Sequence, residues 1–241
     1  VDTNAKRSYN INEYEQLKES FDGTSTFAYM FNSLYIPYPI FNTVGHVESG
    51  VMTLNKYNVK EATRIALPSA YSWPKRAVMY KNCLLEQRVS IEDSDKELVL
   101  YNVHLDAYGK ENGKTDQLNI LISKMKEEYE KGNYVIAGGD FNQTFPGVDT
   151  EKFPIVNTEN FVPSQMSNDY LPKGFKFVTD LERPSSRLLN EVYSGSYDNT
   201  QLYIIDGYIV SPNIDVRSVE TIENNFSYSD HQPVKLKIKL K

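Results

Sequence analysis

The sequence has little cysteine and little histidine, with one residue of the first kind and three of the second among 241 residues. The single cysteine, Cys83, excludes a disulfide within the chain and a zinc site made of several thiolates. No apolar run approaches the roughly 20 residues that a membrane-spanning helix needs. The formal net charge of −6 gives no overall attraction to nucleic acid, but it leaves room for a local basic groove. What remains is a globular chain whose apolar content of 40% is ample for a hydrophobic core.

The start of the chain also lacks a methionine, a basic region and an apolar region of the signal-peptide type. We therefore expect the chain to begin partway through a longer protein. Any signal or membrane anchor would then lie upstream, which leaves the location of the protein in the cell open.

The hydrophobic patterns predict a chain that is rich in strands and has two helices. Apolar residues at three-and-four spacing predict a short helix within 12–21 and a longer one over Thr115–Lys131, with Thr115 as N-cap and Gly132 as its end. The predicted strands cover 50–57, 76–91, 96–106, 134–140, 201–210, 214–222 and 233–241. Residues 145–196 are rich in Pro, Ser, Asn and Gly, which indicates long ordered loops. No repeat or linker divides the chain, so we predict one domain.

The stretch VIAGGDFN, residues 135–142, places a carboxylate and a carboxamide directly after a buried strand. Side chains alternate along extended backbone, so Asp140 and Asn142 are expected to share one face. This pattern is typical of a chemical site at a strand end, and equally of an ordinary turn.

Polar side chains recur at the ends of several predicted strands. They are Asn102, His104 and Asp106, then Asp140 and Asn142, then Asp206, and finally Asp230 and His231. Asp206 stands out because Ile204, Ile205 and Ile209 surround it, and a buried carboxylate is costly without a partner. A histidine is the partner that we expect, since an Asp that orients a His is a recurrent acid–base device. The alternative is that Asp206 caps a bulge or joins a buried salt bridge.

Four of these segments, NVHLD, GGDFN, IDGYIV and YSDHQPV, together carry a family resemblance. In this order and at these separations they resemble the motifs of the endonuclease/exonuclease/phosphatase superfamily, which includes DNase I, abasic-site endonucleases, neutral sphingomyelinases and inositol polyphosphate 5-phosphatases. The resemblance implies an α+β fold of the DNase I type. Its two mixed β-sheets pack face to face with helices outside, in a four-layer αββα sandwich.

The same resemblance implies metal-assisted attack of water on phosphorus and a role for each matching residue. Asp140 would orient or deprotonate the water, and Asn142 would hold it or a phosphoryl oxygen. His231, paired with Asp206, would contact the phosphate, and His104 would donate to a phosphate or leaving oxygen. The implied supporting residue is Asn102 and the implied metal ligand is Asp230. Such an oxygen-rich site suits Mg²⁺ or Mn²⁺.

The chain departs from the family pattern at its beginning. Members contribute an asparagine and a glutamate from two strands that would precede Val1, and the glutamate is the main metal ligand. The resemblance therefore implies that residues 1–241 are one domain that lacks its first strand, first helix and second strand. A chain of this kind is expected to bind metal weakly on its own.

The expected reaction is hydrolysis of a phosphodiester, whose substrate is a small molecule, a lipid head group or a nucleic acid. Two alternatives stay open at this point. One is a phosphomonoesterase that acts on a lipid or inositol phosphate. The other is a binding or scaffold domain that keeps the fold without catalysis, which the absent glutamate favours.

Overall fold

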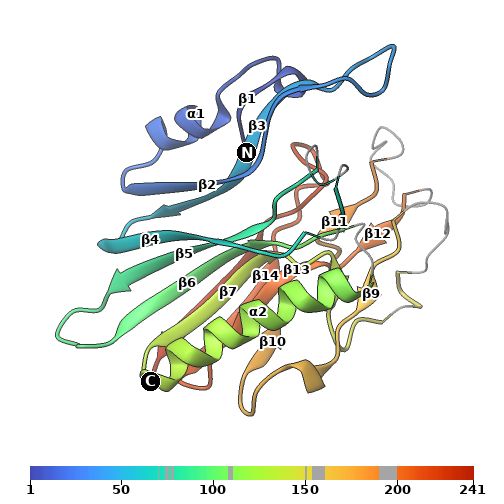
Figure 1. Ribbon diagram of the computed structural model, residues 1–241. Helices are drawn as coiled ribbons and strands as arrows, with labels where there is room; N and C mark the ends of the chain where they lie inside the picture. The colour runs from blue at the N-terminus through green and yellow to red at the C-terminus, as the bar shows by residue number, and fades with distance from the viewer. Residues whose placement is uncertain are drawn as a thin grey trace. The chain divides into compact units, whose positions relative to one another are not determined.

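The computed structural model describes residues 1–69, 71–73, 76, 79–107, 111–149, 151–153, 161–189 and 200–241, except for the side chains of 111–113 (Figure 1). These residues form two units, Val1–Ser123 and Lys124–Lys241, and helix α2 (Glu111–Glu130) contains the boundary between them.

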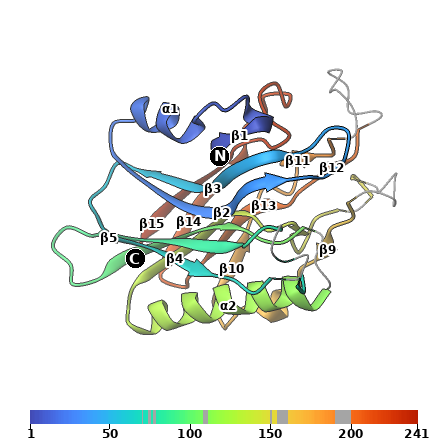
Figure 2. The ribbon, with the colours of Figure 1, turned by 45° about the horizontal axis from the view of Figure 1, so that its top comes forward.

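The first unit is built from two antiparallel sheets. One has the order β1-β3-β2, with β1 over Asp2–Ala5, β2 over Thr24–Ile36 and β3 over Gly45–Asn55. In the other, β5 (Cys83–Ser90) pairs with β4 (Val59–Ala66) on one side and with β6 (Glu97–His104) on the other. A short 3-10 helix, η1, covers Lys6–Ser8. Helix α1 (Glu13–Glu19) lies beside the first sheet (Figure 2), where the Tyr14 ring packs 5.2 Å from that of Phe27.

The two sheets of the first unit pack face to face through alternating side chains. Ala28 and Met30 of β2 and Val51 of β3 form one buried cluster with Cys83 and Leu85 of β5. Each pair of residues two apart points to the same side of its strand, which is why these positions meet. Cys83 is therefore a core residue, fully buried and not bonded to another cysteine.

A buried polar contact also links these sheets. The side chain of Gln87 on β5 is fully buried, donates to Thr26 Oγ1 at 2.8 Å, and accepts from Asn55 Nδ2 at 3.1 Å. A buried amide is stable only when its hydrogen bonds are made, so this contact fixes which residues of the sheets face one another.

The second unit is built around strand β7 (Tyr134–Asp140). Strand β13 (Asp206–Val210) pairs antiparallel with β7 and also with β10 (Lys176–Val178). Strands β14 (Ile214–Thr221) and β15 (Val234–Leu240) form a hairpin. Two shorter strand pairs complete the unit. Strand β8 (Gln143–Thr144) pairs parallel with β9 (Ser164–Gln165), and β11 (Ser186–Arg187) pairs antiparallel with β12 (Leu202–Tyr203). A 3-10 helix, η3, covers Asn168–Tyr170.

Most predicted elements are confirmed with shifted bounds. Helix α1 lies within 12–21, and its N-cap Asn12 accepts the backbone N–H of Glu15 at 3.0 Å. Helix α2 ends before Gly132, which has a φ of +89°, as predicted. Thr115 as its N-cap is wrong, because the helix already begins at Glu111. An acidic residue is favourable in the first turn, and Gly113 costs a helix only about 1 kcal/mol.

Seven strands among the described residues were not predicted: β1, β2, β4 and the short strands β8, β9, β10 and β11. The last three lie in the region 145–196 that was predicted as loops. The strand predicted over 201–210 is two strands, β12 and β13. Strands β1 and β4 are short or alternate with charged residues, so they lack an apolar run. The long strand β2 contains two bulges, which break the alternation of its side chains. Parts of the predicted strand 76–91 and of the predicted loops 145–196 lie outside the described residues.

No helix among the described residues is long and apolar enough to cross a membrane.

We expect Gln87→Met to lower the free energy of unfolding by about 1–3 kcal/mol, since Met keeps the volume but leaves buried polar partners unbonded. Denaturant unfolding measures the change. The control is Gln16→Met, because Gln16 is exposed on α1 and its change should be close to neutral. Equal stabilities of the two variants would contradict the structural role of Gln87.

Candidate active site

Two glycines precede Asp140 because the backbone and a neighbouring ring require them. A Cβ atom on Gly138 would lie 2.6 Å from Cδ1 of Tyr208, the residue that faces it on β13. Gly139 has a φ of +143°, a conformation that other residues rarely adopt. The glycines thus let β7 pass close beneath Tyr208 and end with the side chain of Asp140 beside β13.

Asp140 lies directly opposite Asp206 in the antiparallel register of β7 and β13. Residues opposite one another in such a pair have Cβ atoms about 5 Å apart. Two carboxylates this close repel each other unless a positive group lies between them.

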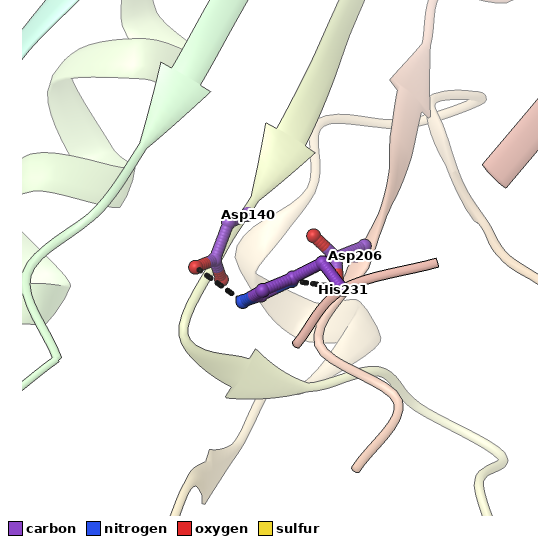
Figure 3. Close-up of side chains that lie close together, drawn as sticks. All are labelled: Asp140, Asp206 and His231. Carbon is purple, nitrogen blue, oxygen red and sulfur yellow. Dashed lines mark hydrogen bonds and ion pairs between the residues drawn. The ribbon is translucent and has the colours of Figure 1, made fainter. Parts of the chain in front are cut away.

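His231 is that group. Its Nδ1 lies 2.8 Å from Asp206 Oδ2, and its Nε2 lies 3.9 Å from Asp140 Oδ2 (Figure 3). The pairing of Asp206 with a histidine, predicted from the apolar neighbours of Asp206, is therefore present. The imidazole is bound on one side and lies close to the second carboxylate on the other.

Asn142 also contacts Asp140, although not for the reason that the sequence suggested. Strand β7 ends at Asp140, and Asn142 has a φ of +50°, so the prediction that strand alternation brings the two side chains together is wrong. A tight turn brings them together instead. Asn142 donates its backbone N–H to Asp140 Oδ1 at 2.7 Å and its Nδ2–H to Asp140 Oδ2 at 3.1 Å.

Two serines that the sequence analysis missed complete the surroundings of the Asp206–His231 pair. Ser185 is fully buried, donates to Asp206 Oδ2 at 2.8 Å, and accepts the backbone N–H groups of Ile205 and Asp206, each at 3.1 Å. Ser186 Oγ lies 3.3 Å from His231 Nε2, and the two residues also form an isolated β-bridge. Their segment, RPSSRLL, lies in a region of mixed polar composition, where two adjacent serines carry no pattern of their own.

The charges of the site shift two pKa values. Burial, together with the negative charges of Asp206 and Asp230, raises the pKa of Asp140 to about 7, against the opposing effects of His231 and the Asn142 N–H. Burial alone would lower the pKa of His231, but the hydrogen bond and charge of Asp206, with the charges of Asp140 and Asp230, raise it to about 9. His231 is therefore an imidazolium at neutral pH.

Asp230 directly precedes His231 and is partly exposed. Its carboxylate accepts from Ser229 Oγ at 3.4 Å, and its backbone carbonyl accepts the N–H of Arg187 at 2.9 Å. Its negative charge acts on both Asp140 and His231.

The remaining predicted site residues, Asn102 and His104, lie on β6 of the first unit. Asn102 Nδ2 donates to the Met52 carbonyl at 2.7 Å and to Thr53 Oγ1 at 3.1 Å, so it joins β6 to β3. His104 ends β6 with an exposed side chain, and its carbonyl accepts from Asn82 Nδ2 at 2.9 Å.

The donor set of the second unit fits a hard divalent cation. One ligand atom each from Asp140, Asp206 and His231 lies within 4.8 Å of the others. His231 is a poor ligand among them, because Asp206 already binds its Nδ1 and an imidazolium has no lone pair to give. The carboxylates of Asp140 and Asp206 offer the oxygen donors that a hard cation such as Mg²⁺ or Mn²⁺ prefers, while Asp230 is outside this group and contributes negative charge nearby.

Similarity to known proteins is found at the level of structure and not of sequence. No protein-family model matches the sequence, and no curated protein matches it. An endonuclease/exonuclease/phosphatase from Beutenbergia cavernae is similar over 95% of this chain and 57% of its own, with a TM-score of 0.65 and 15% identity. The human Nocturnin catalytic domain is similar over 95% and 76%, with a TM-score of 0.56 and 16% identity. A mannosyl-6-phosphatase from Bacteroides thetaiotaomicron is similar over 94% and 81%, with a TM-score of 0.54 and 16% identity.

These similarities confirm the predicted fold class. The chain has the α+β, DNase I-like fold of endonuclease/exonuclease/phosphatase proteins, and the family resemblance of its sequence motifs holds at the level of the fold. The chain spans just over half the length of the Beutenbergia protein.

We expect Ser185→Ala to lower the free energy of unfolding by about 1–3 kcal/mol, since two buried backbone N–H groups would lose their acceptor. The matched control is Ser218→Ala on β14, where the serine is exposed. Denaturant unfolding of both variants tests the prediction, and a Ser185→Ala protein as stable as the control would refute it.

Proposed function

We propose that this chain, which has the endonuclease/exonuclease/phosphatase fold, hydrolyses phosphate esters by attack of water on phosphorus with the help of a divalent metal. The observation that carries the proposal is the imidazolium of His231, bound by Asp206 on one side and close to Asp140 on the other. This arrangement places a fixed positive donor beside a partly buried carboxylate.

In the proposed reaction, His231 stabilises the phosphoryl group as negative charge builds on its oxygens. Asp206 and Ser185 hold the imidazole in one orientation, so its Nε2–H is set before the substrate arrives. Because the imidazolium does not have to reorient during the reaction, it can contribute fully to stabilising the transition state.

Asp140 then acts on the water. A carboxylate whose pKa is about 7 is well matched to accept a proton near neutral pH. Asn142 donates twice to Asp140 and so orients it, a role additional to the contact with water or a phosphoryl oxygen that the family resemblance implies.

Asp230 is the proposed ligand of Mg²⁺ or Mn²⁺, because it is the partly exposed carboxylate next to His231. A bound divalent ion would supply positive charge to the phosphoryl oxygens. For His104 and Asn102 we keep the implied roles as proposals: donation to a phosphate or leaving oxygen for His104, and support for Asn102.

Among phosphate esters we favour a phosphodiester. The names of similar structures include both classes of ester, since one is an endonuclease/exonuclease/phosphatase and another is a mannosyl-6-phosphatase. A phosphomonoesterase is therefore the second candidate. A comparison of bis(p-nitrophenyl) phosphate with p-nitrophenyl phosphate separates the two.

We expect Mg²⁺- or Mn²⁺-dependent hydrolysis of bis(p-nitrophenyl) phosphate by the full-length protein, and a fall in kcat of about 10²–10⁴-fold in His231→Gln. Glutamine keeps a donor for Asp206 but carries no charge. The measurement is release of p-nitrophenol at saturating metal.

The matched control for this substitution is His46→Gln, because His46 pairs with Glu48 at 3.2 Å on β3 of the first unit. Its activity should equal that of the wild type. Hydrolysis that survives in His231→Gln, or that a chelator leaves unchanged, would contradict the proposal.

Asp230→Asn should raise the metal concentration needed for half-maximal activity by at least about 10-fold, since even groups that only orient a metal ligand contribute 10–100-fold. A metal titration of the hydrolysis rate measures this. Asp215→Asn on β14 is the control, because Asp215 is paired with Arg217 at 3.0 Å. An unchanged metal requirement in Asp230→Asn would remove Asp230 from the metal site.

A further inference from the structure

The first unit contains a cavity of about 300 Å³ beside the end of β6. Tyr71, Met79, Tyr80 and Leu105 give it mostly apolar walls. Its volume lies at the lower end of the range for small-molecule pockets, which suits a ligand with a single ring.

Asn82 gives this cavity an unused hydrogen-bond acceptor. Its side chain is 4% exposed, and its Nδ2 donates to the His104 carbonyl at 2.9 Å. Its Oδ1 is buried and has no hydrogen-bond partner among the described residues. Buried polar atoms are nearly always bonded, so an orphan acceptor in a cavity wall indicates a ligand that donates to it.

Asp106 lies in the same wall. It is 6% exposed, and its backbone is held in position by donation to Gln117 Oε1 at 2.9 Å. The polar part of the cavity wall therefore contains the unbonded Asn82 Oδ1 and the Asp106 carboxylate, while its apolar part contains two tyrosine rings.

A buried acceptor beside two tyrosine rings favours a ring-shaped ligand that carries a hydrogen-bond donor. Nucleobase N–H groups are donors as well, but the plane of the ring fixes their direction. A hydroxyl group can rotate to donate to Asn82 Oδ1. The C–H face of a saturated ring can at the same time pack on a tyrosine, which buries its apolar area.

We propose that this cavity binds the hydroxyl-bearing ring of a sugar or sugar-like polyol, with a hydroxyl donated to Asn82 Oδ1. His104 also lines the cavity.

Ligand-observed NMR tests the ring site without any phosphate. The probes are methyl β-D-glucopyranoside and methoxycyclohexane, which share a methoxy-substituted ring but differ in hydroxyl groups. We expect saturation transfer to the glucoside and at least fivefold weaker binding of methoxycyclohexane. Asn82→Leu should lose this preference, and Ala107→Leu, which fills the cavity, should weaken both probes.

The control is Asn32→Leu, an exposed position on β2, which should bind the glucoside as the wild type does. No saturation transfer to the glucoside at about 10 mM would overturn the proposal, as would equal glucoside affinity in Asn82→Leu and wild type. Chemical shifts of the core methyl groups show whether each variant is folded. Ala107→Leu leaves Asn82 intact, so it tests the cavity even where Asn82→Leu unfolds.

The ring site and the proposed function fail in distinguishable ways. Glucoside binding without hydrolysis of either nitrophenyl ester would refute the phosphoesterase and leave the ring site standing. Hydrolysis of a nitrophenyl ester without glucoside binding would refute the ring site and leave the phosphoesterase standing.

Discussion

The candidate site depends on one interaction, the contact between the Asp206 carboxylate and His231 Nδ1 at 2.8 Å. Asp206 has apolar neighbours along its strand, where an unpaired carboxylate would be too costly to keep. His231 brings the charge that makes this position tolerable, and Ser185 adds a hydrogen bond from a third segment of the chain. Three segments distant in sequence are thus held together by a single, partly buried carboxylate. The orientation of the imidazole follows from that constraint.

The position of Asp140 follows from backbone geometry. Gly138 gives room to the ring of Tyr208, and Gly139 adopts a φ that favours glycine. These two conditions set Asp140 opposite Asp206, and the turn at Asn142 then supplies two donors to its carboxylate. Sheet register, glycine and turn act together here: the two glycines and the turn belong to VIAGGDFN, and the register is set with β13.

Much of this could be predicted from the sequence, because strands end in polar clusters where their apolar runs stop. Asp206 could be given a histidine partner since its apolar neighbours made an unpaired charge implausible. Ser185 could not be predicted, because its importance lies in three hydrogen bonds to residues about 20 positions away. Asn142 was paired with Asp140 for the wrong reason, since alternation assumes a strand that continues. Strand β2 was missed because its bulges interrupt the period on which the prediction depends.

The raised pKa of Asp140 helps to decide whether this cluster stabilises the fold or serves catalysis. Asp140 accepts two hydrogen bonds from Asn142 and lies near an imidazolium, yet its pKa still rises to about 7. The donors around Asp140 therefore do not offset its burial and the two neighbouring carboxylates. A cluster selected for stability alone would be better served by apolar side chains of similar volume. The remaining negative charge is what a divalent cation would neutralise, and strongly perturbed groups of this kind gather at functional sites. The cost that Asp140 imposes on the fold is thus the physical argument for an active centre over a scaffold.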